Sequence, residues 1–393
     1  MMRKLIVAIA CAVLCMTISL AQSSPEPDTT TTSGPSAWVY ISSQIGSCCT
    51  AEVFAGTAGP DGKLTPIPGS PFSDNLAALA LNGKYLFGAV YNSTGLMETY
   101  RLQSDGAITY AASSNAAAQT GGSCGAAPTA LFLDHTGTTL YDKYPSVCSN
   151  NLYQAWNVVK ATGALSYLDA AGRTDDLPPD NFALIGNNVF GYTSSCANNT
   201  DHQIYGFKRN SDGSLSDLNL AQVWPKAVGS DVWCPELAAA DPTNHLAIPV
   251  QLMDSSGKAV NNSFQLATYT VNTSTGALST SSTNANMPKV SVRNLAAIRV
   301  SPSGKLVAIA GTGGLQVFHF NGANPITPYT GLLSSLWISD IRWDKNNHLY
   351  AISWQANRLV VFTVTPTSWK WVATYSINKP LGIAVQPLPL AWR

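Results

Sequence analysis

Glu236 and Arg293 are the two residues whose types and positions point to acid–base chemistry in this 393-residue chain. Each lies where a loop leads into a recurring apolar strand, with Glu236 directly after a proline and Arg293 directly before Asn294. A carboxylate at such a site can take a proton from water, and a guanidinium can stabilise the oxyanion that forms. We therefore treat the two as candidate catalytic residues.

Further polar residues fall at equivalent junctions between loops and strands, and they are candidates for ligand binding: Asp74, Asn75, Asp180, Asn181, Asn294, Asp340 and Lys379. Together they would form a polar cup for a small anion, a sugar or a metal ion. The alternative is that short polar side chains cap strand ends, because polar residues are common in loops. The chain has no Asp-x-Asp-x-Asp loop and no Cys-x-x-Cys pair, so we predict no metal and no cofactor.

Four tryptophans lie in the same set of loops: Trp224, Trp233, Trp337 and Trp354. Aromatic rings beside Asn and Asp side chains can stack on sugar faces, and we include Trp233, Trp337 and Trp354 in the predicted ligand site. The alternative is that these rings fill the space between packed sheets, because aromatic side chains bury large areas.

Six cysteines lie beyond the N-terminal apolar segment, and all six fall in these loops: Cys48, Cys49, Cys124, Cys148, Cys196 and Cys234. An even number of cysteines in an exported chain indicates disulfides. The loop positions favour the pairs Cys124–Cys148 and Cys196–Cys234, which leaves Cys48 and Cys49 as a vicinal pair or as free thiols. Such bonds would order long loops, because a disulfide lowers the conformational entropy of the unfolded chain.

Residues 1–21 have the pattern of a secretory signal peptide. Arg3 and Lys4 precede an apolar run, and Ser19-Leu20-Ala21 places small residues at the cleavage positions. The alternative is that the run stays as a membrane anchor; no other run is long enough to span a bilayer. We expect a secreted or periplasmic protein, a disordered linker rich in Ser, Thr and Pro over residues 22–36, and a short tail over 389–393.

The composition sets limits on fold and partners. Charged residues make up 11% of the chain, against about 25% in a typical soluble domain, and 22 basic residues balance 22 acidic ones. The low charge and 45% apolar content exclude a coiled coil and a charged disordered chain. Zero net charge argues against nucleic acid as a partner. We expect a monomer that binds a small molecule, a carbohydrate or a protein.

The elements that must position these residues recur at intervals of 43–60 residues. Each interval holds four short apolar strands, with turn signals such as Asp61-Gly62, Asp212-Gly213 and Thr275-Gly276. Seven such repeats over residues 37–388 predict an all-β, seven-bladed β-propeller. The first strand of each blade is predicted at 76–81, 129–134, 181–185, 236–240, 295–300, 339–343 and 381–385.

The chain order predicts how the ring closes. The repeats begin at a second-type strand, 38–42, and end at a first-type strand, 381–385. The last strand must therefore join the first three strands in one blade, which leaves no open edge in the ring.

The motifs Gly62-Lys63-Leu64, Gly69-Ser70-Pro71-Phe72 and Ser301-Pro302-Ser303-Gly304 resemble those of the seven-bladed lactonase-like propellers. That group includes 6-phosphogluconolactonase-like, muconate-cycloisomerase-like and surface-layer repeat proteins. The resemblance implies that catalytic members carry His, Arg and Glu where the first strands of the blades begin. The matching ring here is Ala77, Thr129, Asn181, Glu236, Ala296, Ser339 and Leu381, with no His and no Arg.

Two functional hypotheses follow. The first is an exported binding or interaction module with a polar, aromatic-bearing site on the channel face, because the ring lacks the residues of the catalytic members. The alternative is a lactonase-like hydrolase that acts on a sugar lactone through Glu236 and Arg293.

Overall fold

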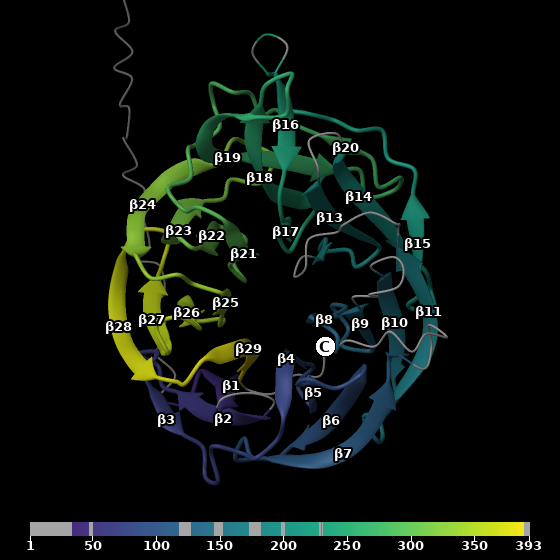
Figure 1. The fold of residues 1–393 in the computed structure, drawn as a ribbon, viewed down its shortest axis with the longest axis vertical. Helices are drawn as coiled ribbons and strands as arrows, with labels where there is room; N and C mark the ends of the chain where they lie inside the picture. Colours follow the sequence, from purple (N-terminus) through teal and green to yellow (C-terminus); the bar gives the residue numbers. More distant parts are fainter. Residues whose placement is uncertain are drawn as a thin grey trace, which may run out of the picture. The chain divides into compact units, whose positions relative to one another are not determined.

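Seven antiparallel sheets are arranged around a central axis in the computed structural model (Figure 1). The structure describes residues 34–46, 50–117, 127–144, 152–172, 182–197, 201–227, 229 and 231–388. The predicted signal peptide, most of the linker and the C-terminal tail lie outside these residues. Every element in the described ranges is a β-strand, and none of them contains a helix long and apolar enough to cross a membrane. The seven-bladed, all-β architecture is confirmed.

The innermost strands of blades 1 to 7 are β29 (Pro380–Pro387), β4 (Leu76–Leu81), β8 (Ala130–Leu133), β12 (Ala183–Leu184), the pair β16 (Val232–Pro235) and β17 (Ala239–Ala240), β21 (Leu295–Val300) and β25 (Asp340–Trp343). The second strands are β1 (Ala37–Ile45), β5 (Tyr85–Val90), β9 (Thr139–Tyr144), β13 (Phe190–Ala197), β18 (His245–Met253), β22 (Leu306–Gly311) and β26 (His348–Ser353).

The third strands are β2 (Thr50–Ala58), β6 (Leu96–Leu102), β10 (Leu152–Val158), β14 (Asp201–Arg209), β19 (Ala259–Val271), β23 (Gly314–His319) and β27 (Arg358–Val364). The outer strands are β3 (Leu64–Pro66), β7 (Ile108–Asn115), β11 (Leu165–Gly172), β15 (Leu215–Leu218), β20 (Leu278–Ser279), β24 (Thr327–Ser334) and β28 (Trp369–Ser376).

Blade 1 is built from both ends of the repeat region, as the sequence predicts. β29 pairs antiparallel with β1 from Ala37 opposite Pro387 to Ser43 opposite Pro380. Figure 1 shows this yellow strand beside the purple one. The backbone N–H of Leu388 donates to Ser36, so the pairing extends one step beyond the strand ends.

The hydrophobic core lies between blades rather than at the centre of the ring. Each of seven buried clusters draws side chains from two neighbouring blades; one of them joins Trp38 and Tyr40 of blade 1 to Leu86 and Tyr100 of blade 2. Burying apolar area is worth about 25 cal/mol per Å², so contacts between blades carry most of the stability.

A repeated hydrogen bond joins neighbouring blades. The glycines of the predicted turns have positive φ, as at Gly213 (97°) and Gly276 (75°), where a side chain would be strained. In four blades a tyrosine of the second strand donates its hydroxyl to a turn carbonyl of the next blade. The pairs are Tyr40 to Gly106, Tyr85 to Ala161, Tyr141 to Gly213 and Tyr192 to Gly276, at 2.6, 2.9, 2.8 and 2.6 Å.

Bulges interrupt the inner strands where the sequence places its ring of site positions. One extra residue occurs in four inner strands, at Ala77–Ala78, around Glu236, at Ala296 and at Leu381. In blade 5 only Ala239–Ala240 (β17) of the predicted strand 236–240 is a strand, and β16 ends just before that range, because Leu237 interrupts the inner edge with a left-handed φ of 54°. A bulge changes the direction of the side chains that follow it.

Two histidines at the first positions of second strands, His245 of β18 and His348 of β26, are bonded to carboxylates of the preceding turns. His348 Nδ1 lies 2.7 Å from Asp344 Oδ2, and His245 Nδ1 lies 2.8 Å from Asp241 Oδ2. Each carboxylate also accepts the backbone N–H of its histidine. These histidines hold turns together on the face opposite the loops with the predicted site.

We predict that Tyr192→Phe destabilises the fold by about 1–3 kcal/mol, because it leaves the buried carbonyl of Gly276 without its donor. Urea unfolding measures the effect. Tyr110→Phe is the matched control, because the Tyr110 side chain is 60% exposed. Equal unfolding midpoints for the two variants would contradict the role of the hydrogen bond.

Candidate functional site

Among the cavities that the inner strands line along the central channel are two neighbouring compartments, of about 60 Å³ and about 330 Å³. The smaller compartment is lined near the strand starts, by Thr129, Ala296 and Ser339 among others. The larger one is lined by residues further along the same strands. Arg299 and Arg342 line both compartments, so the two guanidinium groups lie where the compartments meet.

The two arginines come from neighbouring blades and share one carboxylate. Arg299 lies in β21 and Arg342 in β25, and in each the Nη1 atom donates to the preceding carbonyl, of Ile298 or Ile341, at 2.8 and 2.9 Å. Arg342 Nη1 also donates to Asp340 Oδ1 at 2.5 Å, and Arg299 Nη2 lies 3.5 Å from the same oxygen. The arginine side chains are 23% and 24% exposed.

The channel carries a net positive charge. The described residues that line the two compartments include four titratable side chains: Arg299, Arg342, Asp340 and His135. With neutral imidazole, two cations face one anion. Charges in a channel with apolar walls interact more strongly than charges in water, so an added anion gains more here than at the surface.

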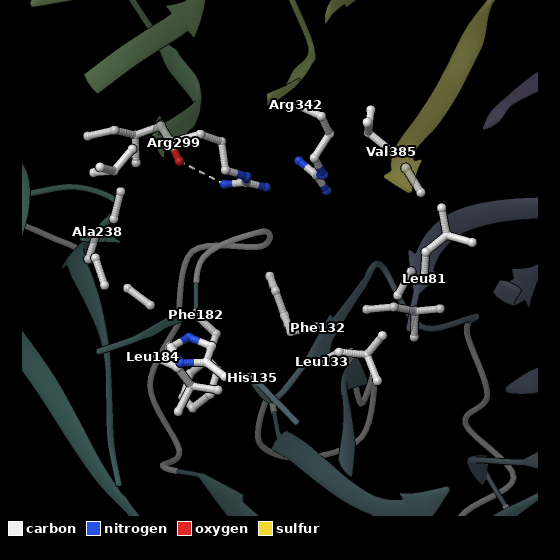
Figure 2. A pocket seen from close by; sticks show the side chains of 18 of the residues that line it. Leu81, Phe132, Leu133, His135, Phe182, Leu184, Ala238, Arg299, Arg342 and Val385 are labelled. Atoms are coloured by element: carbon white, nitrogen blue, oxygen red, sulfur yellow. Dashed lines mark hydrogen bonds between the residues drawn. The ribbon is translucent and has the colours of Figure 1, made fainter. Parts of the chain in front are cut away.

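The wall across from the arginines is apolar. Figure 2 shows both guanidinium groups on one side of the pocket and Phe132, Phe182 and Leu184 on the other. His135 lies on this far side as well, in the turn after β8. The pocket therefore combines one charged wall with one that would contact an apolar or sugar-like body.

Arg299 and Arg342 are not among the site residues that the sequence predicts. Ala296 and Ser339 belong to the ring of strand starts, and Arg299 and Arg342 each follow by three residues. The ring of strand starts has no arginine, but a channel lined by whole strands has more than one ring of side chains. The sequence does contain a sign of this pair, because two adjacent repeats have arginine at the same position of the inner strand. The other five blades have Ala80, Phe132, Leu184, Ala239 and Ala384 at this position.

Glu236 lies in the bulge between β16 and β17. Its backbone N–H donates to the Pro249 carbonyl, while its carboxyl group has no hydrogen bond or ion pair with any described residue. Removal from water disfavours the charged form, and burial raises the pKa of Glu236 from 4.5 to about 7. A carboxyl group with this pKa can take up and release a proton near neutral pH.

Arg293, the proposed partner of Glu236, lies exposed in the loop before β21. No ion pair within 4.0 Å joins the two side chains in the described structure. The Arg293 carbonyl accepts the backbone N–H of Thr312, which ties this loop to the end of blade 6. The structure therefore does not bring the predicted catalytic pair together.

Three of the predicted ligand residues hold loops in place. Asn75 accepts the N–H of Ala51 and donates to the Tyr91 carbonyl, at 2.7 and 3.1 Å. Asn294 and Lys379 both have positive φ, 40° and 36°, directly before inner strands. These contacts match the strand-capping alternative that the sequence left open. Asp180 and Asn181 lie outside the described residues.

The two predicted aspartates differ in their surroundings. Asp340 lines the channel and pairs with Arg342. Asp74 lies beside Tyr100 and Glu98 of β6, where burial raises the pKa of its carboxyl and the Glu98 charge adds to the effect. Asp340 is therefore the predicted acid that belongs to the channel site.

The tryptophans separate into packed and exposed groups. Trp233 is buried, and its indole N–H donates to the Pro225 carbonyl at 2.8 Å. The sequence predicts Trp233 as a ligand residue, but in the structure its ring is not exposed to a ligand. Trp337 and Trp354 are 39% and 41% exposed in loops of blade 7. The Lys379 ammonium lies 5.6 Å from the Trp354 ring centre. These two rings remain candidates for stacking on a ligand.

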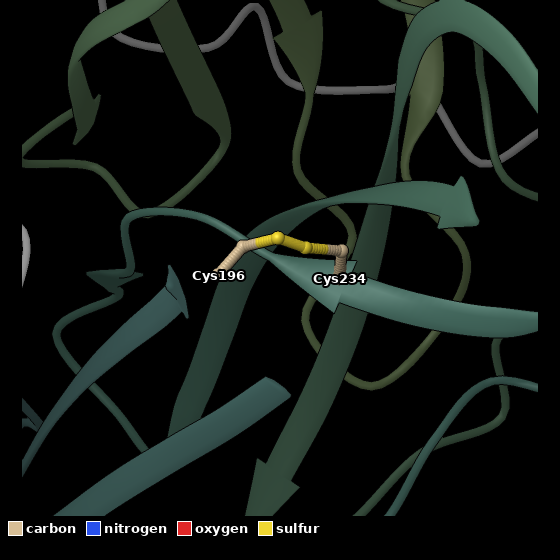
Figure 3. The surroundings of a disulfide bond; sticks show 2 residues. All are labelled: Cys196 and Cys234. Atoms are coloured by element: carbon tan, nitrogen blue, oxygen red, sulfur yellow. A yellow bond between two sulfur atoms is a disulfide. The ribbon is translucent and has the colours of Figure 1, made fainter. Parts of the chain in front are cut away.

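The structure joins Cys196 of β13 to Cys234 of β16 in a disulfide, with a Cα–Cα distance of 5.2 Å (Figure 3). This is the pairing that the sequence predicts between neighbouring blades 4 and 5. Cys48, Cys49, Cys124 and Cys148 lie outside the described residues.

No protein-family model matches the chain, and no curated protein matches it at a significant level. Solved structures do match. A protein from Lactobacillus plantarum has a TM-score of 0.65 and 13% identity, over 90% of this chain and 99% of that one. A Bacteroides fragilis protein, proposed to be a 6-phosphogluconolactonase, has a TM-score of 0.64 and 13% identity, over 91% and 99%.

The periplasmic gluconolactonase of Pseudomonas aeruginosa is also similar, with a TM-score of 0.61 and 12% identity over 91% of this chain and 99% of that one. At such low identity the likeness shows the fold alone. The chain has the seven-bladed fold of the lactonase-like propellers, which confirms the resemblance at that level.

We predict that Glu236→Gln removes a pH dependence of stability. The folded pKa lies above the unfolded value, so the carboxyl group stabilises the fold below about pH 4.5, and this contribution is lost as the pH rises through 7. Relative to the variant, the wild-type free energy of unfolding should fall by on the order of 3 kcal/mol between about pH 5 and about pH 8. Urea unfolding across this range measures it, and parallel curves for the two proteins would disagree with burial of the carboxyl group.

Proposed function

We propose that this protein is an exported binding protein whose central channel takes up a small organic anion, a sugar derivative with a carboxylate or phosphate group. The observation that carries the proposal is the pair of guanidinium groups at the junction of the two channel compartments, with one carboxylate between them.

The arginine pair offers an anion both free N–H donors and an excess of positive charge. A guanidinium group presents several N–H donors in a planar fork that matches carboxylate and phosphate oxygens. Arg342 Nε and Nη2 have no hydrogen bond with any described residue, so they are available to such oxygens. An anion bound here would neutralise the excess positive charge of the channel.

The size and walls of the channel favour a small ligand with an organic body. The larger compartment, of about 330 Å³, is at the lower end of the usual range for small-molecule sites, roughly 300–1,000 Å³. Phe132 and Phe182 provide ring faces across from the arginines. Trp337 and Trp354 offer two more exposed rings on blade 7. Apolar rings with nearby hydrogen-bond donors suit a sugar.

Export is supported by three separate observations. The first residues have the composition of a signal peptide. The Cys196–Cys234 disulfide suits an oxidising compartment. The similar gluconolactonase of Pseudomonas aeruginosa is described as periplasmic.

We predict that the protein binds gluconate or 6-phosphogluconate and that Arg299→Met and Arg342→Met each weaken binding by at least about tenfold, the value of one charged hydrogen-bond pair. Isothermal titration calorimetry measures the affinity. Arg358→Met is the matched control, because it removes the same charge from an exposed position on β27. Unchanged affinity in both channel variants, or an equal loss in the control, would rule out the arginine site.

Lactone hydrolysis is the second candidate, and the raised pKa of Glu236 favours it. In that reaction the Glu236 carboxylate takes a proton from water, the hydroxide oxygen bonds to the lactone carbonyl carbon, and the ring C–O bond breaks. The ring oxygen takes that proton back from Glu236, and the resulting hydroxy acid releases its carboxylic proton to solvent, which leaves a carboxylate that the arginines would hold.

A panel of sugar lactones separates the two functions. The binding proposal predicts no turnover above the spontaneous rate, measured by proton release at constant pH. Turnover that Glu236→Gln abolishes, while gluconate binding is kept, would instead establish the hydrolase.

A further inference from the structure

A cluster of three metal-binding side chains lies at the junction of blades 4 and 5, separate from the channel arginines. Cys196 and His202 are directly opposite each other on β13 and β14. Cys234 comes from β16 of the next blade. The two sulfur atoms and an imidazole nitrogen all lie within 4.8 Å of one another.

One side of the cluster borders a cleft, through His202. His202 lines a cleft of about 350 Å³ between β14 and β15, together with Gln203, Gln222 and Asp217. Cys196 and His202 are half-buried, and Cys234 is buried. A small ion or a reductant can therefore approach from the His202 side, while the other side is held by the packing of blade 5.

We infer that reduction of the Cys196–Cys234 disulfide creates a zinc site, with the two thiolates and the His202 imidazole as ligands. Two sulfur ligands and one nitrogen ligand are a donor set that Zn²⁺ accepts in tetrahedral geometry. A site with three protein ligands leaves a fourth position for water. Hard cations such as Ca²⁺ and Mg²⁺ are excluded, because they require oxygen ligands.

The chemistry balances with a dithiol as the reductant. The dithiol gives two electrons and two protons to the disulfide and becomes a disulfide itself, and Cys196 and Cys234 become thiols. Zinc binding then releases two protons as the thiolates form. The sulfur atoms must separate to about 3.7 Å, the spacing set by Zn–S bonds of about 2.3 Å in a tetrahedron.

Disulfide and metal are mutually exclusive at this site, because the same two sulfur atoms make either bond. The disulfide already joins blades 4 and 5. The metal would join them through the same residues, with His202 of β14 added. The site would therefore keep the two blades connected in both oxidising and reducing surroundings.

Cobalt titration of the full chain tests this inference. Co²⁺ replaces Zn²⁺ in tetrahedral sites and reports its ligands through visible bands and a thiolate charge-transfer band. We expect one bound Co²⁺ with thiolate bands after reduction with a phosphine, displaced by Zn²⁺, and no such bands in the oxidised protein. His202→Ala, which keeps both cysteines, should weaken Co²⁺ binding by at least about tenfold.

Two further variants complete the test. Cys196→Ser should weaken Co²⁺ binding and reduce the thiolate bands, because it leaves Cys234 as the one sulfur ligand of the described cluster. His319→Ala is the matched control, because that ring stacks on Tyr329 in blade 6. The inference is overturned if the reduced wild type binds no Co²⁺, or if His202→Ala binds it as tightly as His319→Ala. If Cys196→Ser does not fold, the His202 comparison alone decides.

Discussion

The pairing of β29 with β1 is the constraint on which the rest of this structure depends. It brings the last strand of the repeat region to the first and makes blade 1 from both. β29 then contacts β4 on one side and β25 on the other, so the inner strands form a closed ring. A closed ring has no exposed inner edge and encloses a channel whose shape the blades share. The pairing also places Ile383 of β29 in the hydrophobic core that blades 1 and 7 share.

The low charge of the chain makes the few charged residues inside the ring important for its electrostatics. Most strands are apolar or carry Ser, Thr and Asn, and the blades are joined by buried side chains and by the tyrosine-to-turn hydrogen bonds. Few charges lie inside the ring, so those that do determine its electrostatics. Arg299 and Arg342 face the channel with Asp340 as the only described acid that lines either compartment. A modest excess of one positive charge is significant there because the walls are apolar.

Much of the fold could be predicted because repetition and turn chemistry are local. Gly213 and Gly276 have the positive φ that their Asp-Gly and Thr-Gly turns predict, and the strand order required β29 to close the ring. The Cys196–Cys234 pairing followed from the same map.

The site was harder to predict, because the direction of a side chain on an inner strand depends on bulges that the apolar pattern does not encode. Polar residues at strand starts have the side chains of ligand-binding residues and of residues that cap strands, and Asn75 makes capping contacts. The buried indole N–H of Trp233 is satisfied by the Pro225 carbonyl in a loop. The repeat pattern of the sequence does not show that this carbonyl lies close to the ring. Arg299 and Arg342 lie three residues further along the inner strands than the strand starts, where the catalytic members of the similar family carry their site residues. Identical spacing in two adjacent repeats was the only local sign of them.

Anion binding by the arginine pair is tested most directly by a crystal structure of the protein with selenate. Selenium scatters anomalously, so the positions of bound anions can be located independently of the surrounding density. The account predicts a selenate peak within hydrogen-bond distance of both Arg299 and Arg342. A channel without such a peak, in a crystal whose surface arginines and lysines do hold selenate, would contradict it.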